Sequence, residues 1–214
     1  MIISRGRNYI FVHIPKTGGT SLAQALEGRA MKDDILLGDT PKALRRRHRV
    51  KGAGARGRLW KHSTLADIEG LLSREEIAQM FSFTMVRNPW DRMVSYYHWL
   101  REQSFDHVAV RLAKALDFSA FLNDPRIAQS FRTFPARSYM CDDEGQERAR
   151  LYIRLEHFEA DAAPLWEHLG FRLDLPHLNA SARAGGYREY YSARDSRRLG
   201  EIAAEDVSRF GYSF

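Results

Sequence analysis

Short apolar runs alternate with longer amphipathic segments along this chain. Three runs have the length of a strand: Tyr9–Ile14, Phe81–Val86 and Leu151–Leu155. Amphipathic segments follow the first two, at Thr20–Gly28 and from Pro89 onward, and their apolar positions recur at helical spacing. Strands that alternate with helices favour a parallel sheet covered on both faces. We therefore predict an α/β fold of three layers, with a central parallel β-sheet flanked by helices.

Capping signals predict where two of the helices begin. Ser73 followed by Glu76 forms a capping box for a helix that runs to Met80. Asn88 is a good N-cap and Pro89 a good first residue for the helix after the second strand.

Weaker patterns predict further elements. Helical spacing recurs over 64–72 and 156–170, a strand entering a turn fits 138–145, and a charged helix begins at about Asp195. No linker or internal repeat interrupts the chain, so residues 1–214 are expected to form a single domain.

Composition narrows the chemistry. Lys and Arg together number 33, of which 6 are Lys, and they exceed the 27 Asp and Glu residues. The arginine bias suggests an anionic ligand, because guanidinium groups match phosphate, sulfate and carboxylate. Cys141 is the only cysteine, which excludes an intramolecular disulfide and a cysteine zinc site. No apolar run reaches the roughly 18 residues of a membrane span, and no signal-peptide layout is present, so a cytoplasmic location is expected.

The turn after the first strand has the composition of an anion-binding loop. Glycines permit close backbone approach, the helix start offers unpaired N–H groups, and a lysine and hydroxyl groups complement a tetrahedral anion. These residues are Lys16, Thr17, Gly18, Gly19, Thr20 and Ser21. The loop is not a Walker A motif, since its lysine precedes the glycine pair, and this disfavours a simple ATPase.

A second anion site is predicted after the second strand. Arg87 stands where that strand should end, and ligands collect at the carboxyl ends of parallel strands. Ser95 lies seven residues beyond Asn88, about 10 Å along a helix. The two side chains could clamp a phosphate together. The alternative for Arg87 is a surface ion pair with Asp91.

These motifs resemble those of a known family. PKTGGTS after a strand, followed about seventy residues later by RNPWDRMVSYY, is similar to the sulfotransferases that use 3′-phosphoadenosine 5′-phosphosulfate (PAPS). The resemblance is strongest to the carbohydrate branch, which includes the heparan sulfate 2-O-sulfotransferases and bacterial relatives. YIRLEHFEAD and the terminal EDVSRFGYSF extend it over most of the chain.

The resemblance implies a P-loop-like fold and a defined reaction. A sulfuryl group would move in line from PAPS to a hydroxyl acceptor, with release of adenosine 3′,5′-bisphosphate (PAP). The acceptor is expected to be a carbohydrate, which could itself be anionic. No metal is required. The first loop, from Lys16 to Ser21, would bind the 5′ side of the donor. Arg87 and Ser95 would hold the 3′-phosphate. Lys16 would also stabilise the leaving oxygen.

Sulfuryl transfer also needs a base for the acceptor proton. His62 is the preferred candidate, because it precedes a predicted helix at a place broadly comparable to the histidine base of related carbohydrate sulfotransferases. Its neighbour Lys61 could contact an anionic acceptor, although a solvated lysine is the simpler interpretation. The competing candidates for the base are His13, His48, His98 and Glu156.

Two further basic segments have open roles. The glycines of the Arg45–Arg58 stretch favour a mobile loop, which could grip an acidic glycan, bind nucleic acid or be solvated surface. Nucleic acid is disfavoured because no recognition motif accompanies the stretch. In the tail, the resemblance to sulfotransferases implies a loop over the nucleotide, from which Arg183 or Arg188 would touch phosphate. Rival functions are an unusual P-loop phosphotransferase and a non-catalytic nucleotide or polyanion binder. The oligomeric state is left open.

Overall fold

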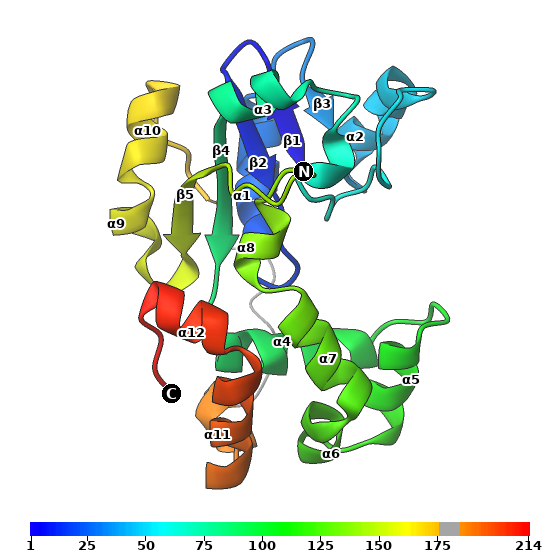
Figure 1. Cartoon of the computed structure of the whole chain (residues 1–214), viewed down its shortest axis with the longest axis vertical. Helices are drawn as coiled ribbons and strands as arrows, with labels where there is room; N and C mark the ends of the chain where they lie inside the picture. The colour runs from blue at the N-terminus through cyan, green and yellow to red at the C-terminus, as the bar shows by residue number, and fades with distance from the viewer. Residues whose placement is uncertain (176–184) are drawn as a thin grey trace. The chain divides into compact units, whose positions relative to one another are not determined.

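The computed structural model describes residues 1–175 and 185–214. The chain divides into two compact units, each made of two segments. The sheet unit comprises Met1–Val86 and Ala136–Leu178, and the helical unit comprises Arg87–Pro135 and Asn179–Phe214. Figure 1 shows that all labelled strands belong to the first and that the second is built from helices. The single domain expected from the sequence stays a prediction.

The sheet unit contains a five-stranded sheet in the order β3-β1-β2-β4-β5. Its strands are β1 (Ile2–Ser4), β2 (Tyr9–Val12), β3 (Ile35–Leu36), β4 (Phe81–Val86) and β5 (Ala149–Arg154). β2, β4 and β5 are parallel, whereas β1 runs antiparallel to both of its neighbours. The predicted α/β class is confirmed, but the sheet is mostly rather than wholly parallel. The pattern missed β1 and β3, which are too short to show a period.

Side chains alternate across this sheet and build a core on each face. On one face, Phe11 and Phe83 pack with Leu22 of α1 (Gly19–Gly28) and with Leu165 of α10 (Ala163–Leu169). On the other face, β2 contributes Ile10 and Val12, which pack with apolar residues between Leu65 and Met80 and with Met140. The result is the three-layer arrangement that the sequence predicted.

The remaining helices of the sheet unit are short. They are α2 (Pro41–Arg46), α3 (Arg74–Gln79), α8 (Ala136–Tyr139) and α9 (Phe158–Asp161), with 3₁₀ turns at Arg47–Val50, Ala66–Ile68 and Leu155–His157. The capping box at Ser73 and Glu76 is confirmed, and so is the end of α10 at Gly170, which adopts a left-handed φ of 74°. The predicted helix over 64–72 is wrong, because only the 3₁₀ turn forms there.

Two other expectations for this unit need correction. The segment 156–170 is not one helix, since a 3₁₀ turn, α9 and α10 succeed one another. The predicted strand near 138–145 is reduced to an isolated bridge between Cys141 and Glu147.

The helical unit forms around a core of aromatic and aliphatic side chains. Its helices are α4 (Pro89–Arg101), α5 (Val108–Ala115), α6 (Phe118–Asn123), α7 (Pro125–Thr133), α11 (Ala193–Ile202) and α12 (Ala204–Phe210), with a 3₁₀ turn at Tyr187–Tyr190. α4 supplies much of the core, including Met93, Val94 and Tyr97. The predicted N-cap at Asn88 is confirmed by a bond from Trp90 N to its side chain.

Candidate functional site

The turn after β2 has an unusual backbone that places the start of α1. Gly18 has a left-handed φ of 83° and is the N-cap of α1, and Lys16 also has a positive φ, of 65°. A left-handed lysine is sterically unfavourable, and such strain is concentrated at functional sites. Thr17 as a whole is 2 % exposed, and its hydroxyl donates to the carbonyl of Ile14 at 2.9 Å and braces the turn. This hydroxyl is therefore used within the protein.

The N-terminus of α1 presents donors that the protein does not satisfy. In the described part of the chain, the N–H groups of Gly18, Gly19 and Thr20 donate no hydrogen bond. Ser21 N makes a long bond, of 3.3 Å, to Gly18 O. No acidic side chain lies in the first turn to neutralise the helix dipole. Unpaired N–H groups at a positive helix end, preceded by a lysine, have the chemistry that suits a phosphate or sulfate group.

Both glycines of this loop are also required by packing. A Cβ at Gly18 would lie 2.7 Å from Cδ1 of Leu155, which follows β5, and would sit on a left-handed backbone. A Cβ at Gly19 would lie 2.6 Å from Cδ2 of the His13 ring. The glycines therefore let α1 start close against the ends of the strands. The groups of this loop that could contact an anion are its N–H groups and Lys16.

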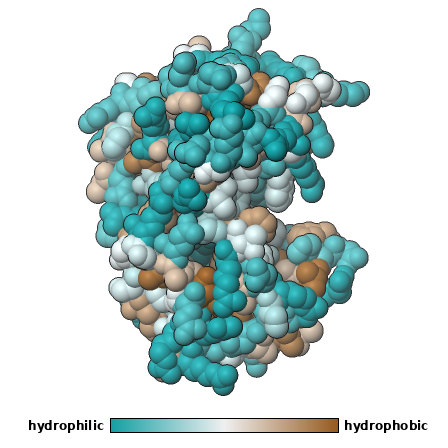
Figure 2. Space-filling view, in the orientation of Figure 1, coloured by the Kyte–Doolittle hydropathy of each residue, from teal (hydrophilic) through white to brown (hydrophobic). Residues whose placement is uncertain are grey.

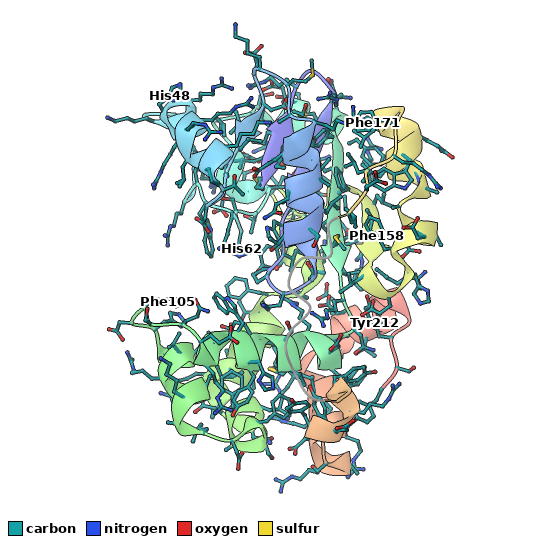
Figure 3. All side chains as sticks on the ribbon, turned by 180° about the vertical axis from the view of Figure 1, so that it is seen from behind. His48, His62, Phe105, Phe158, Phe171 and Tyr212 are labelled. Carbon is teal, nitrogen blue, oxygen red and sulfur yellow. The ribbon has the colours of Figure 1, made fainter. Side chains whose placement is uncertain are left out.

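His62 lies beside this loop through its contact with His13. Its Nδ1 is 2.6 Å from the carbonyl oxygen of His13, and the two imidazole rings meet edge to face at 4.8 Å. Figure 3 shows His62 near the N-terminal end of α1. A carbonyl can only accept, so Nδ1 carries the proton and donates it. In the neutral ring Nε2 is then the basic nitrogen, which is the tautomer that a general base needs.

Burial keeps both histidines neutral at physiological pH. Desolvation lowers the pKa of His62 to about 4, opposed by its bond to His13 and assisted by the charge of Lys61. Desolvation also lowers the pKa of His13 well below its usual value, with contributions from His62 and Lys16 among others. His13 is buried and stacks on Phe11, which lies two residues earlier, on β2.

Arg87 and Ser95, the residues of the second predicted site, belong to the helical unit, which starts at Arg87. Arg87 donates to the Asp91 carboxylate from Nε at 2.8 Å, and a second guanidinium nitrogen lies 2.7 Å from the same oxygen. The predicted ion pair is thus present, but its side chains are only 13 % and 15 % exposed, so it is not a surface pair. Ser95 is buried one turn beyond Asp91 on α4. Residues four apart lie on the same face of a helix, so Asp91 and Ser95 share one face of α4. The ion pair with Asp91 therefore holds the Arg87 side chain on the face that carries Ser95.

The terminal segment of the chain braces the start of α4. Asn88 Nδ2 donates to the carbonyl of Ser213 at 3.0 Å, while its Oδ1 caps Trp90 N. The hydroxyl of Tyr191 donates to the carbonyl of Trp90 at 2.9 Å. The sequence predicted Asn88 only as a cap. Its bond to Ser213 could not be predicted, because the two residues are more than 100 positions apart in the chain. The terminal segment thus stabilises the backbone next to Arg87.

The other candidate bases occupy different settings. His48 is exposed and bonds the carbonyl of Arg45 through Nδ1. His98 lies on α4 with its ring edge to Tyr190. Glu156 follows β5 in a 3₁₀ turn. His13 and His62 are tied to the loop after β2, because the His13 ring lies against Gly19 and the His62 ring bonds to the carbonyl of His13.

The basic segment is more ordered than its glycines suggested. Arg45 and Arg46 end α2, and a 3₁₀ turn follows, so the expectation of an irregular loop is wrong for its first part. Arg46 donates to the carbonyls of Met31 and Asp34 at 2.8 and 3.3 Å. Lys61, expected to be solvated, pairs with the exposed Asp39 at 2.6 Å.

Other predicted features of the site remain open. Arg188 lies over the rings of Tyr187 and Phe214, and Arg183 falls outside the described residues. In the described ranges, no group of three or more His, Cys, Asp or Glu side chains could hold a metal ion. No helix there combines the length and the hydrophobicity needed to cross a membrane.

Comparison with known proteins assigns the fold and the family. The profile of the sulfotransferase family matches residues 1–213. Among solved structures, the chain is similar to the mouse sulfotransferase SULT7A1 complexed with PAP, with a TM-score of 0.53 and 15% sequence identity over 96% of this chain and 86% of that one. At this identity the likeness shows the fold. No curated protein matches the sequence. The family match covers nearly the whole sequence, and the chain therefore belongs to the sulfotransferase family.

Proposed function

We propose that this sulfotransferase takes its sulfuryl group from PAPS and delivers it to a hydroxyl of a carbohydrate. The observation that carries the proposal is the start of α1, where unpaired N–H groups and Lys16 stand next to a histidine held in the basic tautomer. The similar mouse enzyme was solved with PAP, the product that PAPS would leave. The arginine-rich composition and the resemblance to the carbohydrate branch support a polar, anionic acceptor.

The donor would be bound at both of its charged ends. The N–H groups at Gly18, Gly19 and Thr20 and the Lys16 ammonium suit the 5′-phosphosulfate. Arg87 and Ser95 suit the 3′-phosphate. Arg87 is the residue that follows the end of β4, and β4 pairs in parallel with β2, which leads into the Lys16 loop. Adjacent parallel strands deliver their following residues to one edge of a sheet, which is where ligands bind in such folds.

The chemistry assigns one role to each side chain. Nε2 of His62 accepts the proton of the acceptor hydroxyl as its oxygen forms a bond to sulfur. The bond between sulfur and the bridging phosphate oxygen breaks, and its electrons stay on that oxygen. Lys16 and the helix end stabilise this charge. The products are a sulfate ester, PAP and protonated His62. The positive field comes from the protein, so these steps need no metal.

Nucleotide binding tests the donor site. PAP and ATP are titrated by calorimetry without magnesium into the wild type and into Lys16→Ala and Arg87→Ala. We expect the wild type to prefer PAP, and each variant to bind PAP at least tenfold more weakly. Arg132→Ala, an exposed arginine of α7, is the matched control and should bind as the wild type does. Equal binding of ATP, or indifference to Arg87, would instead indicate a phosphotransferase.

Turnover tests the base. With labelled PAPS and a panel of glycans, His62→Ala should lower the rate by about 10²- to 10⁴-fold, the usual contribution of a general base, and leave PAP affinity unchanged. His48→Ala is the control, since His48 is exposed and its ring bonds to the carbonyl of Arg45. Normal turnover in His62→Ala would remove His62 from the mechanism and leave the donor site standing.

A further inference from the structure

A single exposed aromatic ring stands beside the proposed base. Trp60 is 40 % exposed, and no other Phe, Tyr or Trp in the described part of the sheet unit is exposed. Its indole meets the His62 ring edge to face at 5.0 Å. The Arg58 guanidinium lies 5.1 Å from the centre of the same indole. An apolar face, a guanidinium cation and the proposed base are therefore gathered within five residues, from Arg58 to His62.

This turn is fixed by hydrogen bonds that do not involve the indole. The Ser63 hydroxyl, fully buried, lies 2.9 Å from Trp60 N and from the carbonyls of Arg58 and Trp60. Thr64 N donates to Asp67 at 2.7 Å and holds the end of the turn. Leaving a tryptophan in water has no benefit for folding, because its burial would stabilise the protein. A rigid backbone that presents an exposed indole is instead typical of a binding surface.

We propose that Trp60 and Arg58 form the acceptor subsite, in which a sugar ring stacks on the indole and a carboxylate of the glycan pairs with Arg58. The proposal rests on the sulfotransferase function proposed above. A pyranose has a face of C–H bonds that packs on an aromatic ring while its hydroxyls stay in water. One of these hydroxyls would then lie toward His62, the neighbour of the indole. The carboxylate matches the guanidinium fork.

The surroundings favour a sugar over an aromatic acceptor. Flat phenols and steroids are held in enclosed, largely apolar pockets. Here a charged group, the Arg58 guanidinium, lies over the indole, and the indole itself is 40 % exposed to water. A ligand in this setting must tolerate water and charge on most sides, as an acidic glycan does.

The test measures glycan binding without nucleotide, so it does not depend on turnover. The protein contains 4 tryptophans, and labelling with 5-fluorotryptophan gives one ¹⁹F signal for each. Trp60→Phe assigns the signal of Trp60. Hexasaccharides of heparosan, hyaluronan and polygalacturonate are the acidic probes, maltohexaose is the neutral probe, and 2-naphthol is the aromatic probe. At least one acidic probe should shift the Trp60 signal selectively.

The variants then separate the two parts of the subsite. Trp60→Ala should weaken the acidic glycan at least tenfold, and Arg58→Gln should remove most of its advantage over maltohexaose. Phe105→Ala, an exposed aromatic of the helical unit, should have no effect. The proposal is overturned if no acidic hexasaccharide shifts the Trp60 signal, if maltohexaose binds the wild type as tightly, or if only 2-naphthol binds there. PAP titration of the same variants reports separately on the donor site, so a failure of either proposal can be recognised.

Discussion

Gly19→Ala tests the contact that links the anion-binding loop to the candidate base. The new Cβ would lie 2.6 Å from Cδ2 and 3.0 Å from Nε2 of His13, closer than carbon atoms can approach. The His13 ring cannot yield freely, because it is buried between Phe11 and His62. Overpacking of this kind costs about 1–3 kcal/mol of unfolding free energy. For a chain of this size the melting temperature falls by roughly 2–4 °C for each kcal/mol.

Activity should fall further than stability. Displacement of the His13 ring also moves His62, and an error of about 1 Å in a catalytic group can cost roughly 100-fold in rate. Calorimetric melting and turnover with labelled PAPS measure the two effects. Gly28→Ala is the matched control on the same helix, since its Cβ would meet nothing within 4 Å and alanine favours a helix by up to about 1 kcal/mol. If Gly19→Ala melts and turns over as the wild type does, the close contact with His13 does not exist in solution.

Three further perturbations follow from the same contacts. The pKa of His62 is lowered to about 4 in the folded protein, so the unfolded chain binds this proton more readily. The contribution of His62 to stability is therefore fully present above about pH 6.5, and about 3 kcal/mol of unfolding free energy is lost as the pH falls toward 4. Urea melts of His62→Gln should show a smaller loss of stability with acid than the wild type shows. Asn88→Ala should cost about 1–2 kcal/mol in calorimetric melting and weaken PAP binding. Asn88→Asp should restore only the cap, because its carboxylate cannot donate to the carbonyl of Ser213. Ser73→Ala should cost about 1 kcal/mol without any change in PAP affinity, and a change in affinity would show that α3 reaches the site.

Local signals in the sequence were enough to predict the elements that carry the proposed donor site. β4 is found at the predicted bounds, and α1 begins one residue from its predicted start. Asn88 and Pro89 started α4 as expected, because a cap and a proline act within one turn of the backbone. The order of strand, glycine turn and helix also depends only on neighbours in sequence. These are the features for which local chemistry decides the structure.

Features that depend on distant partners could not be predicted in this way. The helix expected over 64–72 gave way to a 3₁₀ turn, where the backbone instead bonds to residues outside the segment, as Leu65 N does to the carbonyl of Tyr139. The carbonyl that fixes the tautomer of His62 belongs to His13, 49 residues earlier. The sequence placed both histidines among the candidates, but only the structure shows that they contact each other and that burial lowers both pKa values.

Burial and nearby cations set the protonation state of the proposed base. A base with a pKa of about 4 is unprotonated at neutral pH, but it accepts a proton reluctantly. Cationic charge contributes to this state, since Lys61 lowers the pKa of His62 and Lys16 lowers that of the adjoining His13. An anion bound at the start of α1 would offset the field of Lys16 at His13, because opposite charge nearby favours the protonated imidazole. The low pKa of His62 follows instead from its own burial and from Lys61, so binding of an anion at the loop would leave His62 neutral and able to accept the proton of an acceptor hydroxyl.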